Sequence, residues 1–543
     1  MGCGVPGSRR LCTGRRRGDC PGDTCGVTSG ERAVDRERSV AGSGGNDDGV
    51  VNEYRERAHQ YDAAPGWVLP DVRDLVPEGS RVEQLTVRSD SVYFDTEEHD
   101  LLVHGVTLRC RTGQADAGWQ LTVPAGDVRT EIRVDPTGSH TTVPKELAAV
   151  TAGVRRGQAL RHIVTVHTDR AVRRVLAADD RVVVEVADDR VEAVAPGRRA
   201  ATLSSWREVE ADLGPAGDED LLAAIDTSFT ASGATASASP NKVARALGVT
   251  TAERADHPPA RTAGDVLGAY LAEQDDALIT GDLTLRRGLG GIHPTRVATR
   301  RLRSTLRVFA DYVDPDRASG FDAELSWYAG LLGAVRDREV QRARFTAAIA
   351  ALPAELVLGP VAARIEQHLL TEQLHHQKTL GRAMNSKRYF GLLAESARWV
   401  TDPPLTTLAA QKPAKLRAAV RAADRKVTKH LATGLGGNGD DVELHRARKA
   451  GKRARYAAEL TRNVLGKKKA KNSIRRYQDL QDILGEHQDA VVAADLLRRI
   501  AAGTPAHPDE NGFTYGLLYA RELGRADQSR RLARNWDPKA ARV

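Results

Sequence analysis

The feature that most constrains the fold is a helical motif that occurs twice in the second half of the chain. Its copies run from His293 to Arg303 and from His445 to Arg455, and their shared basic positions are 152 residues apart. A Leu-Gly element with a later Asp and Val follows each copy, at Leu332-Gly333 and Leu484-Gly485, with the same separation. Two separate motifs that keep one separation indicate an internal duplication of a helical unit.

Helical geometry places the basic residues of each copy on one face of a helix. At about 100° per residue, the cationic side chains fall within roughly 80° of one another in the first copy and about 120° in the second. The first set is His293, Arg296, Arg300, Arg303 and Arg307; the second is His445, Arg448, Lys449, Lys452 and Arg455, with Tyr456. The residues on the opposite faces, which we predict to be buried in the core, are Leu302, Leu306, Phe309, Ala450, Ala454 and Ala457.

These basic faces predict an anion-binding surface. Surface helices usually intersperse acidic residues, which relieve repulsion between like charges four positions apart, but the segment from His293 to Arg307 contains no Asp or Glu. Guanidinium groups bind phosphate oxygens in a bidentate way, and histidines can donate to phosphate and gain charge as the pH falls. A solvated charged face is the alternative, and it explains one basic stripe more easily than two.

Composition supports an anionic partner and more than one domain. The 543 residues exceed what one hydrophobic core usually serves, so we expect two domains joined by linkers. The net charge of +8 favours an anionic partner. Aromatic residues make up only 4%, which argues against base stacking and hence against a nucleic-acid partner. No apolar run of about eighteen residues is present, so we predict neither a transmembrane helix nor a membrane partner.

The apolar pattern of residues 50–248 has a period of two, which is typical of strands. The clearest segments are Ser91–Asp95, Val106–Arg111, Trp119–Val123, Thr130–Val134, Arg181–Ala187 and Trp206–Leu213. Short, closely spaced strands predict an antiparallel sheet or barrel. We expect residues 249–261 to be a linker and residues 262–535 to form long helices. The predicted fold class is therefore α+β with two domains.

Residues 1–48 are rich in Gly, Arg, Ser and Asp, and we expect them to be disordered. Four of the five cysteines lie in this segment, with a spacing unlike that of paired zinc ligands. The segment also lacks the apolar core of a secretory signal, and Cys110 is the one cysteine left for the folded part. A reducing cytoplasm is the expected location.

Alternation along the predicted strands gathers charge on one face of the sheet. The residues that share a face are Arg109 with Arg111, Glu131 with Arg133, and Glu208 with Glu210. If the sheet closes, these side chains line a tunnel whose guanidinium groups hold phosphate oxygens and whose carboxylates hold divalent cations. An open sheet with a solvated, salt-bridged face is the alternative.

The two basic helices, with the segments Leu332 to Asp337 and Leu484 to Asp489, resemble the CHAD domain, the conserved histidine α-helical domain, over about residues 262–535. The resemblance implies two four-helix bundles related by pseudo-twofold symmetry, a ligand that is inorganic polyphosphate, and association with polyphosphate granules. It requires no cofactor. The binding residues that it implies are His293, Arg296, Arg300, Arg303, Arg307, His445, Arg448, Lys449, Lys452 and Arg455, and Arg336, Asp337, Gln488 and Asp489 are expected to position the basic helices.

The N-terminal motifs resemble the CYTH domain of the triphosphate tunnel metalloenzymes. They are Tyr93-Phe94-Asp95-Thr96, Leu108 to Arg111, Trp119-Gln120-Leu121, Arg129 to Arg133, Glu185 to Asp188, Trp206 to Glu210 and Asn241-Lys242. The resemblance implies an eight-stranded tunnel in which glutamates bind Mg²⁺ or Mn²⁺, and hydrolysis of tripolyphosphate or nucleoside triphosphates or cyclisation of ATP. The implied metal ligands are Glu56, Glu131, Glu185, Glu208 and Glu210, and the implied phosphate ligands are Arg109, Arg111, Arg133, Arg170 and Lys242. A CYTH domain before a CHAD domain is a familiar bacterial arrangement.

The first strand departs from the CYTH pattern, which begins with Glu-x-Glu-x-Lys. Alignment on the segment Pro65–Pro70 places that motif at Glu56–Gln60, where Ala58 replaces the second glutamate and Gln60 replaces the lysine. Thr122 stands where a tunnel lysine is expected. The loss of a carboxylate weakens a Mg²⁺ site, because Mg²⁺ tolerates geometric error poorly. We therefore assign no catalytic residue and expect a tunnel that binds phosphate but hydrolyses it slowly or not at all.

Three functions follow from these patterns. The first is a cytoplasmic polyphosphate-binding protein, found on polyphosphate granules, whose tunnel is vestigial or weakly active. The second is an active Mg²⁺- or Mn²⁺-dependent triphosphatase that the helical half localises, which replacement of the lost carboxylate by Asp188 or Asp212 would favour. The third is a nucleic-acid-binding protein, because a basic stripe also matches a phosphodiester backbone.

Overall fold

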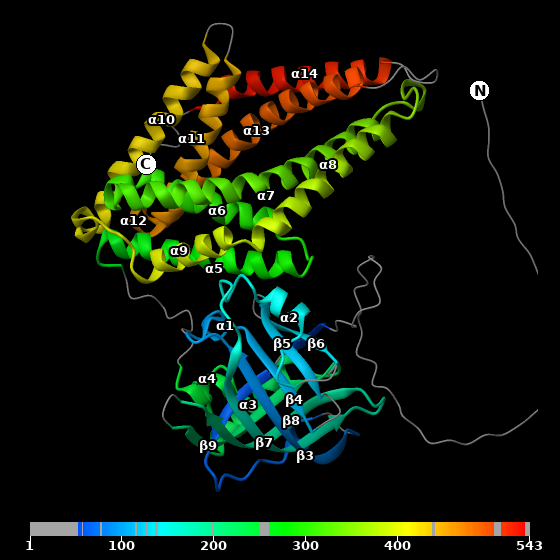
Figure 1. Cartoon of the computed structure of the whole chain (residues 1–543), viewed down its shortest axis with the longest axis vertical. Coiled ribbons are helices and arrows are strands. Elements are labelled where there is room, and N and C mark those ends of the chain that lie inside the picture. Colours follow the sequence, from blue (N-terminus) through cyan, green and yellow to red (C-terminus); the bar gives the residue numbers. More distant parts are fainter. Residues whose placement is uncertain are drawn as a thin grey trace, which may run out of the picture. The chain divides into compact units, whose positions relative to one another are not determined.

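A computed structural model of the chain describes residues 53–56, 58–76, 79–113, 117–125, 128–135, 140–197, 200–249, 260–436, 440–503 and 512–537. A sheet occupies the N-terminal half and long helices the C-terminal half (Figure 1). The segment 1–48, predicted to be disordered, and most of the predicted linker 249–261 lie outside the described residues. Among the helices of the described part, none is long and apolar enough to cross a membrane.

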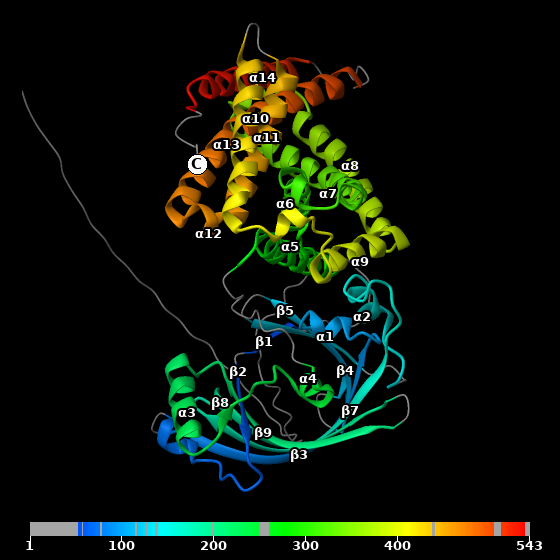
Figure 2. The same cartoon turned by 90° about the vertical axis from the view of Figure 1, so that its left-hand side faces the viewer.

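The described strands form one antiparallel sheet. They are β1 (Glu53–Glu56), β2 (Ala58–Ala63), β3 (Arg81–Asp95), β4 (Thr107–Thr112), β5 (Gly118–Ala125), β6 (Val128–Val134), β7 (Arg161–Leu176), β8 (Val182–Ala195), β9 (Thr202–Leu213) and β10 (Thr235–Ala236). Their order is β1-β6-β5-β4-β3-β7-β8-β9-β2-β10. Only one residue separates β1 from β2, which lie near opposite ends of this order, so the sheet curves until its two sides approach each other (Figure 2). The hydrogen-bonded ladder itself is not closed among the described residues.

Every strand segment predicted from alternation coincides with or overlaps a strand of this sheet. β7 escaped prediction because charged residues occur on both of its faces: Asp169 and Arg173 on one, Arg170 and Arg174 on the other. Apolar alternation is therefore not visible in its sequence. The strand is nevertheless central, since it pairs with β3 on one side and with β8 on the other.

The apolar face of the sheet is covered by helix α3 (Glu219–Ala231). Ile225 and Phe229 of this helix are fully buried and belong to the same core as Val184 and Val186 of β8. The α3 helix begins at Asp218, whose side chain accepts a hydrogen bond from the backbone N–H of Leu221, as acidic and small polar residues commonly do at this position. Two shorter helices, α1 (Asp100–Val103) and α2 (Lys145–Val150), precede β4 and β7.

A fourth helix, α4 (Lys242–Leu247), lies on the opposite, polar face and carries one of the predicted phosphate ligands (Figure 2). Its first residue follows Asn241, whose Oδ1 accepts a hydrogen bond from the backbone N–H of Ala244 at 2.8 Å. Because this cap fixes the start of the helix, Lys242 stands in the first turn. From there its side chain reaches the polar residues of β8 and β9.

The helical half repeats one unit of four long helices. Its helices are α5 (Ala263–Arg286), α6 (Ile292–Val308), α7 (Pro315–Ala350), α8 (Val361–Met384), α9 (Lys387–Thr401), α10 (Arg417–Leu435), α11 (Asp441–Leu460), α12 (Arg462–Leu465), α13 (Lys467–Gly503) and α14 (Phe513–Arg534). α7 and α13 begin 152 residues apart, and so do α8 and α14. The separation read from the basic motifs therefore extends to whole helices, which confirms the predicted pair of related bundles.

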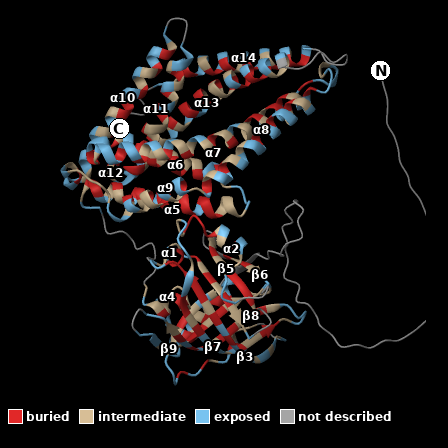
Figure 3. Ribbon diagram, viewed as in Figure 1, coloured by how far each residue is buried: buried red, intermediate tan, exposed pale blue. Residues whose placement is uncertain are grey.

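The predicted core positions of both basic helices are buried. Leu302 and Leu306 of α6 retain 1% and 3% of their accessible surface, and Ala450 and Ala454 of α11 retain 5% and 0%. Figure 3 shows the buried positions as stripes along the helices rather than as continuous bands. Burial on one stripe leaves the other face of α6 and α11 for their basic side chains.

Candidate anion-binding site

The basic faces of α6 and α11 meet where the two helices pack together. We call Arg296 and Arg300 of α6, with Arg448 and Lys452 of α11, the basic cluster. Burial, followed by the charges of Arg448, Arg300 and Arg296, lowers the pKa of Lys452 to about 6. A lysine in such a place is held mainly neutral at pH 7 and regains its charge when an anion comes close.

The duplication is visible in the side-chain contacts as well as in the helices. Arg296 pairs with Asp337 of α7 at 3.3 Å, and the equivalent Arg448 pairs with Asp489 of α13 at 3.6 Å. The two aspartates therefore position one arginine each, as expected from the sequence. The side chains of Arg296 and Arg448 retain 26% and 21% of their accessible surface, so each is partly open to a further anion.

The repeated Leu-Gly element has a physical reason in the same contacts. A Cβ atom on Gly333 would lie 3.5 Å from Nη2 of Arg296, and one on Gly485 would lie 3.3 Å from Nη2 of Arg448. Each guanidinium group thus rests directly against a glycine of the neighbouring helix. Any side chain larger than a methyl group at these positions would displace the arginine.

Several cations of the site have no acidic partner within the described part of the chain. Arg300, Lys449 and Lys452 form no ion pair there, and the Nε atoms of Arg300 and Arg448 are buried without a hydrogen-bond acceptor. A buried donor without an acceptor costs free energy that a bound acceptor recovers. Phosphate oxygens are acceptors of the required charge.

The two histidines flank the basic cluster. Burial, then Arg336, Arg300 and Arg296, lowers the pKa of His293. Burial and Lys449 likewise lower the pKa of His445, against a hydrogen bond with Gln488 that raises it. The sequence predicted that both histidines gain charge as the pH falls. Because their pKa values are lowered, they become charged at a lower pH than an exposed histidine does.

The other three predicted ligands have partners of their own. Arg303 and Arg307 share Asp322 of α7, at 3.1 Å and 2.6 Å. Arg455 hydrogen-bonds Gln478 and stacks over the ring of Tyr456, 4.8 Å from its centre. A cation that the sequence argument missed, Arg453, lies near Arg307 and Arg303, whose charges together with burial lower its pKa.

Four of the five predicted phosphate ligands of the sheet line one small cavity. Arg109, Arg111, Arg170 and Lys242 surround a space of about 10 Å³ together with Ser89, Ser91, Tyr93, Val166 and Thr168. Arg133 is not among them and instead donates to Glu131 at 2.6 Å. A space of this size corresponds to about one water molecule, so a triphosphate would enter only after side chains move.

The carboxylates of this face are neutralised by its own cations. Asp189, whose side chain is completely buried, accepts two hydrogen bonds of 2.8 Å from Arg170 and contacts Lys242 at 2.9 Å. The pKa of Asp189 is lowered to about 2 because these two cations outweigh its burial. Glu208 contacts Lys242 at 2.5 Å, and Glu210 contacts Arg170 at 3.1 Å.

Asp189, and not its neighbour Asp188, faces the cations of the polar face. Asp188 pairs with Arg207 at 2.7 Å, and strand alternation puts it on the opposite face from Asp189. Of the two carboxylates that the sequence left open as replacements for the one lost at position 58, Asp188 therefore lies on the other face of the sheet. Asp212 does lie in register with Glu185 and with Ala58.

The described carboxylates do not fit a divalent cation in this arrangement. Glu131 is paired with Arg133, Glu185 with Arg174, Glu208 with Lys242 and Glu210 with Arg170. No group of three His, Cys, Asp or Glu residues suited to a metal occurs among the residues that the structure describes. The backbone of Glu56 pairs with Arg129 in β1 and β6, but its side chain lies outside the described residues.

The departures from the CYTH pattern lie on the same polar face. Ala58 is in register with Asp212, and Gln60 with Glu210. Gln60 donates to Glu210 at 3.4 Å, where a lysine would have formed an ion pair. Thr122 is in register with Glu131.

Comparison with known proteins assigns a domain family to each half of the chain. The family model of the CYTH domain matches residues 71–247 and that of the CHAD domain matches residues 269–498. The uncharacterized proteins MT2285 and Rv2226 of Mycobacterium tuberculosis are 34% identical over 501 residues, which cover 88% of this chain and 94% of each relative. The matched ranges lie inside the predicted domains 50–248 and 262–535, whose outer limits remain predictions.

One solved structure is similar to the helical half of the chain and another to the sheet half. The CHAD domain of the plant Ricinus communis is 22% identical and covers 52% of this chain and 91% of its own, with a TM-score of 0.42. The Hippeastrum protein HpAC1, which has a dominant triphosphatase activity, is 14% identical and covers 36% of this chain and 96% of its own, with a TM-score of 0.22.

Proposed function

The chain belongs to the family of proteins that carry a CYTH domain followed by a CHAD domain, and from this premise we propose that it binds inorganic polyphosphate through α6 and α11. The observation that carries the proposal is the basic cluster. Two helices of a duplicated unit bring together cations of which Arg300 and Lys452 have no acidic partner in the described residues. A linear polyanion would neutralise all of them at once.

The predicted phosphate ligands fall into two groups in this proposal, those that contact phosphate directly and those at the edge of the site. The basic cluster, with Lys449 and the two histidines, contacts phosphate oxygens directly. Arg303, Arg307 and Arg455 act at the periphery, since each already holds a protein acceptor. In the cell, the protein would associate with polyphosphate granules in the cytoplasm.

The experiment is a titration of the full chain with long-chain polyphosphate by calorimetry. The variant R296A/R300A/R448A/K452A should abolish binding while its helical circular dichroism stays unchanged. The matched control is R181A/R398A/R498A/R499A, which removes the same number of basic side chains, here exposed arginines that each pair with a carboxylate. Unchanged affinity in the first variant, or equal losses in both, would refute the assignment to the basic cluster.

Polyphosphate is distinguished from nucleic acid by competition. Both ligands present a row of phosphate charges, but stacking of bases needs aromatic side chains, and only 4% of this chain is aromatic. We expect duplex DNA at equal charge concentration to leave bound polyphosphate in place. Displacement at similar concentrations would replace the polyphosphate proposal by general polyanion binding.

For the sheet half we propose phosphate binding with slow or no hydrolysis. The support is the convergence of Arg109, Arg111, Arg170 and Lys242 on one cavity, beside carboxylates that are already paired with cations. The competing function, a metal-dependent triphosphatase acting on tripolyphosphate or nucleoside triphosphates, requires free carboxylates on this face. Phosphate release from tripolyphosphate with Mg²⁺ or Mn²⁺ separates the two: sustained release that Glu208→Ala abolishes would establish the enzyme.

A further inference from the structure

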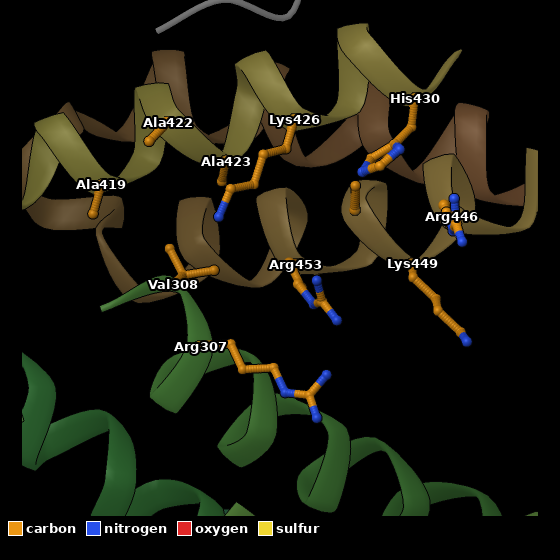
Figure 4. Close-up of a pocket in the computed structure, with 11 residues that line it drawn as sticks. Arg307, Val308, Ala419, Ala422, Ala423, Lys426, His430, Arg446, Lys449 and Arg453 are labelled. Atoms are coloured by element: carbon orange, nitrogen blue, oxygen red, sulfur yellow. The ribbon is translucent and has the colours of Figure 1, made fainter. Parts of the chain in front are cut away.

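A larger cavity lies between α10, α11 and the C-terminal end of α6, outside the basic cluster. Its volume is about 330 Å³. The residues that line it are Arg307, Val308, Ala419, Ala422, Ala423, Lys426, His430, Arg446, Lys449, Ala450 and Arg453. Figure 4 shows Ala419, Ala422 and Val308 toward one end and Arg446 and Lys449 toward the other, with Lys426 and Arg453 between them. The cavity thus has an apolar end and a cationic end.

The duplication indicates which side chains leave this cavity open. At the separation of 152 residues that the motifs keep, Ala419 and Ala422 of α10 align in sequence with Leu267 and Tyr270 of α5. Leu267 is completely buried and Tyr270 is 8% exposed. Alanine methyl groups of α10 therefore stand where α5 carries large buried side chains.

Charge differs between the bundles at the same place. Arg301 of α6 donates to Glu459 of α11 at 3.1 Å and 2.9 Å. The pair related to it by 152 residues is Arg453 of α11 with Arg307 of α6, because position 307 carries an arginine where position 459 carries a glutamate. A salt bridge on one side of the pseudo-twofold axis is therefore replaced by two like charges on the other.

Two further substitutions add cations to the cavity wall. Lys426 and Lys449 stand where the first bundle has Gln274 and Val297. Within the described part of the chain, neither lysine pairs with a carboxylate, and nor does Arg453. The acidic groups nearby are Glu443, which binds His430 and Arg446, and Asp322, which binds Arg303 and Arg307. The wall consequently carries an excess of positive charge.

We propose that this cavity is a binding site for an organic phosphate of nucleotide size. Its phosphate groups bind Arg307, Lys449 and Arg453, and its apolar part lies on Ala419, Ala422 and Val308. The size supports an organic ligand, because pockets for small molecules usually begin at about 300 Å³. Inorganic phosphate alone would leave the alanine surface exposed to water, which forfeits the burial of apolar area.

The site is separate from the proposed polyphosphate site, with which it shares only Arg307 and Lys449. None of the four residues of the basic cluster lines the cavity. An organic phosphate would therefore bind in the cavity while polyphosphate occupies the basic cluster. The concentration of nucleotides in the cell would then set how much of the protein has its cavity filled. Arg307 and Lys449, which belong to both ligand sets, offer a route by which one ligand could alter the affinity for the other.

The test uses ATP as the probe, with a chelator present, and the full chain carrying R109A/R111A so that the sheet cavity does not contribute. We expect calorimetry to show ATP binding that A419L/A422Y, which restores the side chains of the first bundle, weakens by at least about tenfold. R307E, which restores the pair with Arg453, should do the same, because a charge-assisted contact is lost. R498E, with the same change of charge at an exposed site, should leave ATP affinity unchanged.

Two outcomes would overturn the inference. ATP affinity that is unchanged in both R307E and A419L/A422Y would remove the site altogether. Tripolyphosphate that binds as tightly as ATP, and is equally weakened by A419L/A422Y, would exclude a role for the organic part. Polyphosphate binding is measured on the same variants, and R296A/R300A/R448A/K452A should keep its ATP binding. Failure of this inference is therefore distinct from failure of the polyphosphate proposal.

Discussion

At the scale of single residues, Lys452 links the chemistry of the basic cluster to pH. Burial and three arginines hold its pKa at about 6, well below the value near 10.4 of a lysine in the unfolded chain. Between these two values the unfolded state binds the additional proton. Lys452 thus makes the folded protein less stable as the pH falls from about 10 towards 6, a cost that a bound polyanion removes.

We therefore predict that polyphosphate binding takes up a proton at neutral pH. Lys452 should contribute close to one proton at pH 7, since a group with a pKa near 6 is mostly neutral there. Calorimetry in buffers of different ionisation enthalpy measures this number. The uptake should fall by close to one proton in K452M, leaving the part due to His293 and His445, whose pKa values are also lowered. It should be unchanged in K468M, which replaces an exposed lysine of α13. An uptake that K452M leaves unchanged would assign the proton to other groups.

Asp189 is the second residue whose role depends on its surroundings. It is completely buried and holds both Arg170 and Lys242, two of the predicted phosphate ligands. Its pKa of about 2 lies below the unfolded value near 3.9. The stability that it contributes is therefore present above about pH 4 and is lost as the pH falls towards 2.

D189N should lower the free energy of unfolding at pH 7 by about 3 kcal/mol, because it leaves two buried cations without their carboxylate. Urea unfolding monitored by circular dichroism measures the change, and the difference from the unsubstituted protein should shrink below pH 4. D495N is the control: Asp495 is half exposed and pairs with Arg498 and Arg499 on the surface, so its loss should cost less than about 1 kcal/mol. Equal effects of the two substitutions would contradict the buried network.

At the scale of helices, α6 and α11 act as one surface because their faces meet. Each helix alone shows a basic stripe in its sequence, and each could have faced solvent separately. The pairs Arg296–Asp337 and Arg448–Asp489 tie each stripe to its neighbouring helix, α7 or α13. The two copies of the motif therefore form one basic surface, which under our proposal serves one long polyanion rather than two short ones.

A joint surface predicts a specific dependence of binding on salt. Neutralised phosphates release counterions, so the logarithm of the association constant falls with the logarithm of the salt concentration by roughly 0.7 per contact for a single strand. R296A/R448A, one substitution on each helix, should reduce this slope by roughly 1.4. The control R498A/R499A on α13 should leave it unchanged. A slope that is insensitive to R296A/R448A would place the polyanion elsewhere.

At the scale of the whole molecule, the chain combines two cation-rich surfaces built from different secondary structure. The polar face of the sheet gathers cations and carboxylates that neutralise one another. The helices gather cations of which several have no acidic partner among the described residues. Electrostatic attraction of an external polyanion is therefore stronger at the helices.

This difference predicts that the two surfaces can be inactivated independently. R109A/R111A should reduce tripolyphosphate binding by about tenfold and leave the affinity for long-chain polyphosphate within about twofold, because charge-assisted contacts are local. R296A/R300A/R448A/K452A should have the reverse effect. The measurement is the affinity of each of the two variants for tripolyphosphate and for long-chain polyphosphate. Loss of both ligands in either variant would show one shared site.

Much of this organisation is encoded locally and was accessible from the sequence. The constant separation of the two His-to-Arg segments predicted the duplicated bundles, and helical periodicity correctly placed Leu302 and Leu306 in the core. Alternation correctly put Arg109 and Arg111 on one face of the sheet. Periodicity succeeds here because each face of a helix or strand is determined by residues within a few positions of one another.

The partners of these faces were decided by the tertiary structure alone. Nothing in the sequence indicates that Lys452 lies among the arginines of α6, that Asp189 rather than Asp188 faces Arg170, or that Ala419 and Ala422 leave a cavity beside Arg307. Such contacts join residues far apart in the chain, and they depend on how helices and strands pack. The amino-acid sequence by itself thus determined which side chains form the basic stripes, whereas packing decided which of their charges are neutralised and which remain for a ligand.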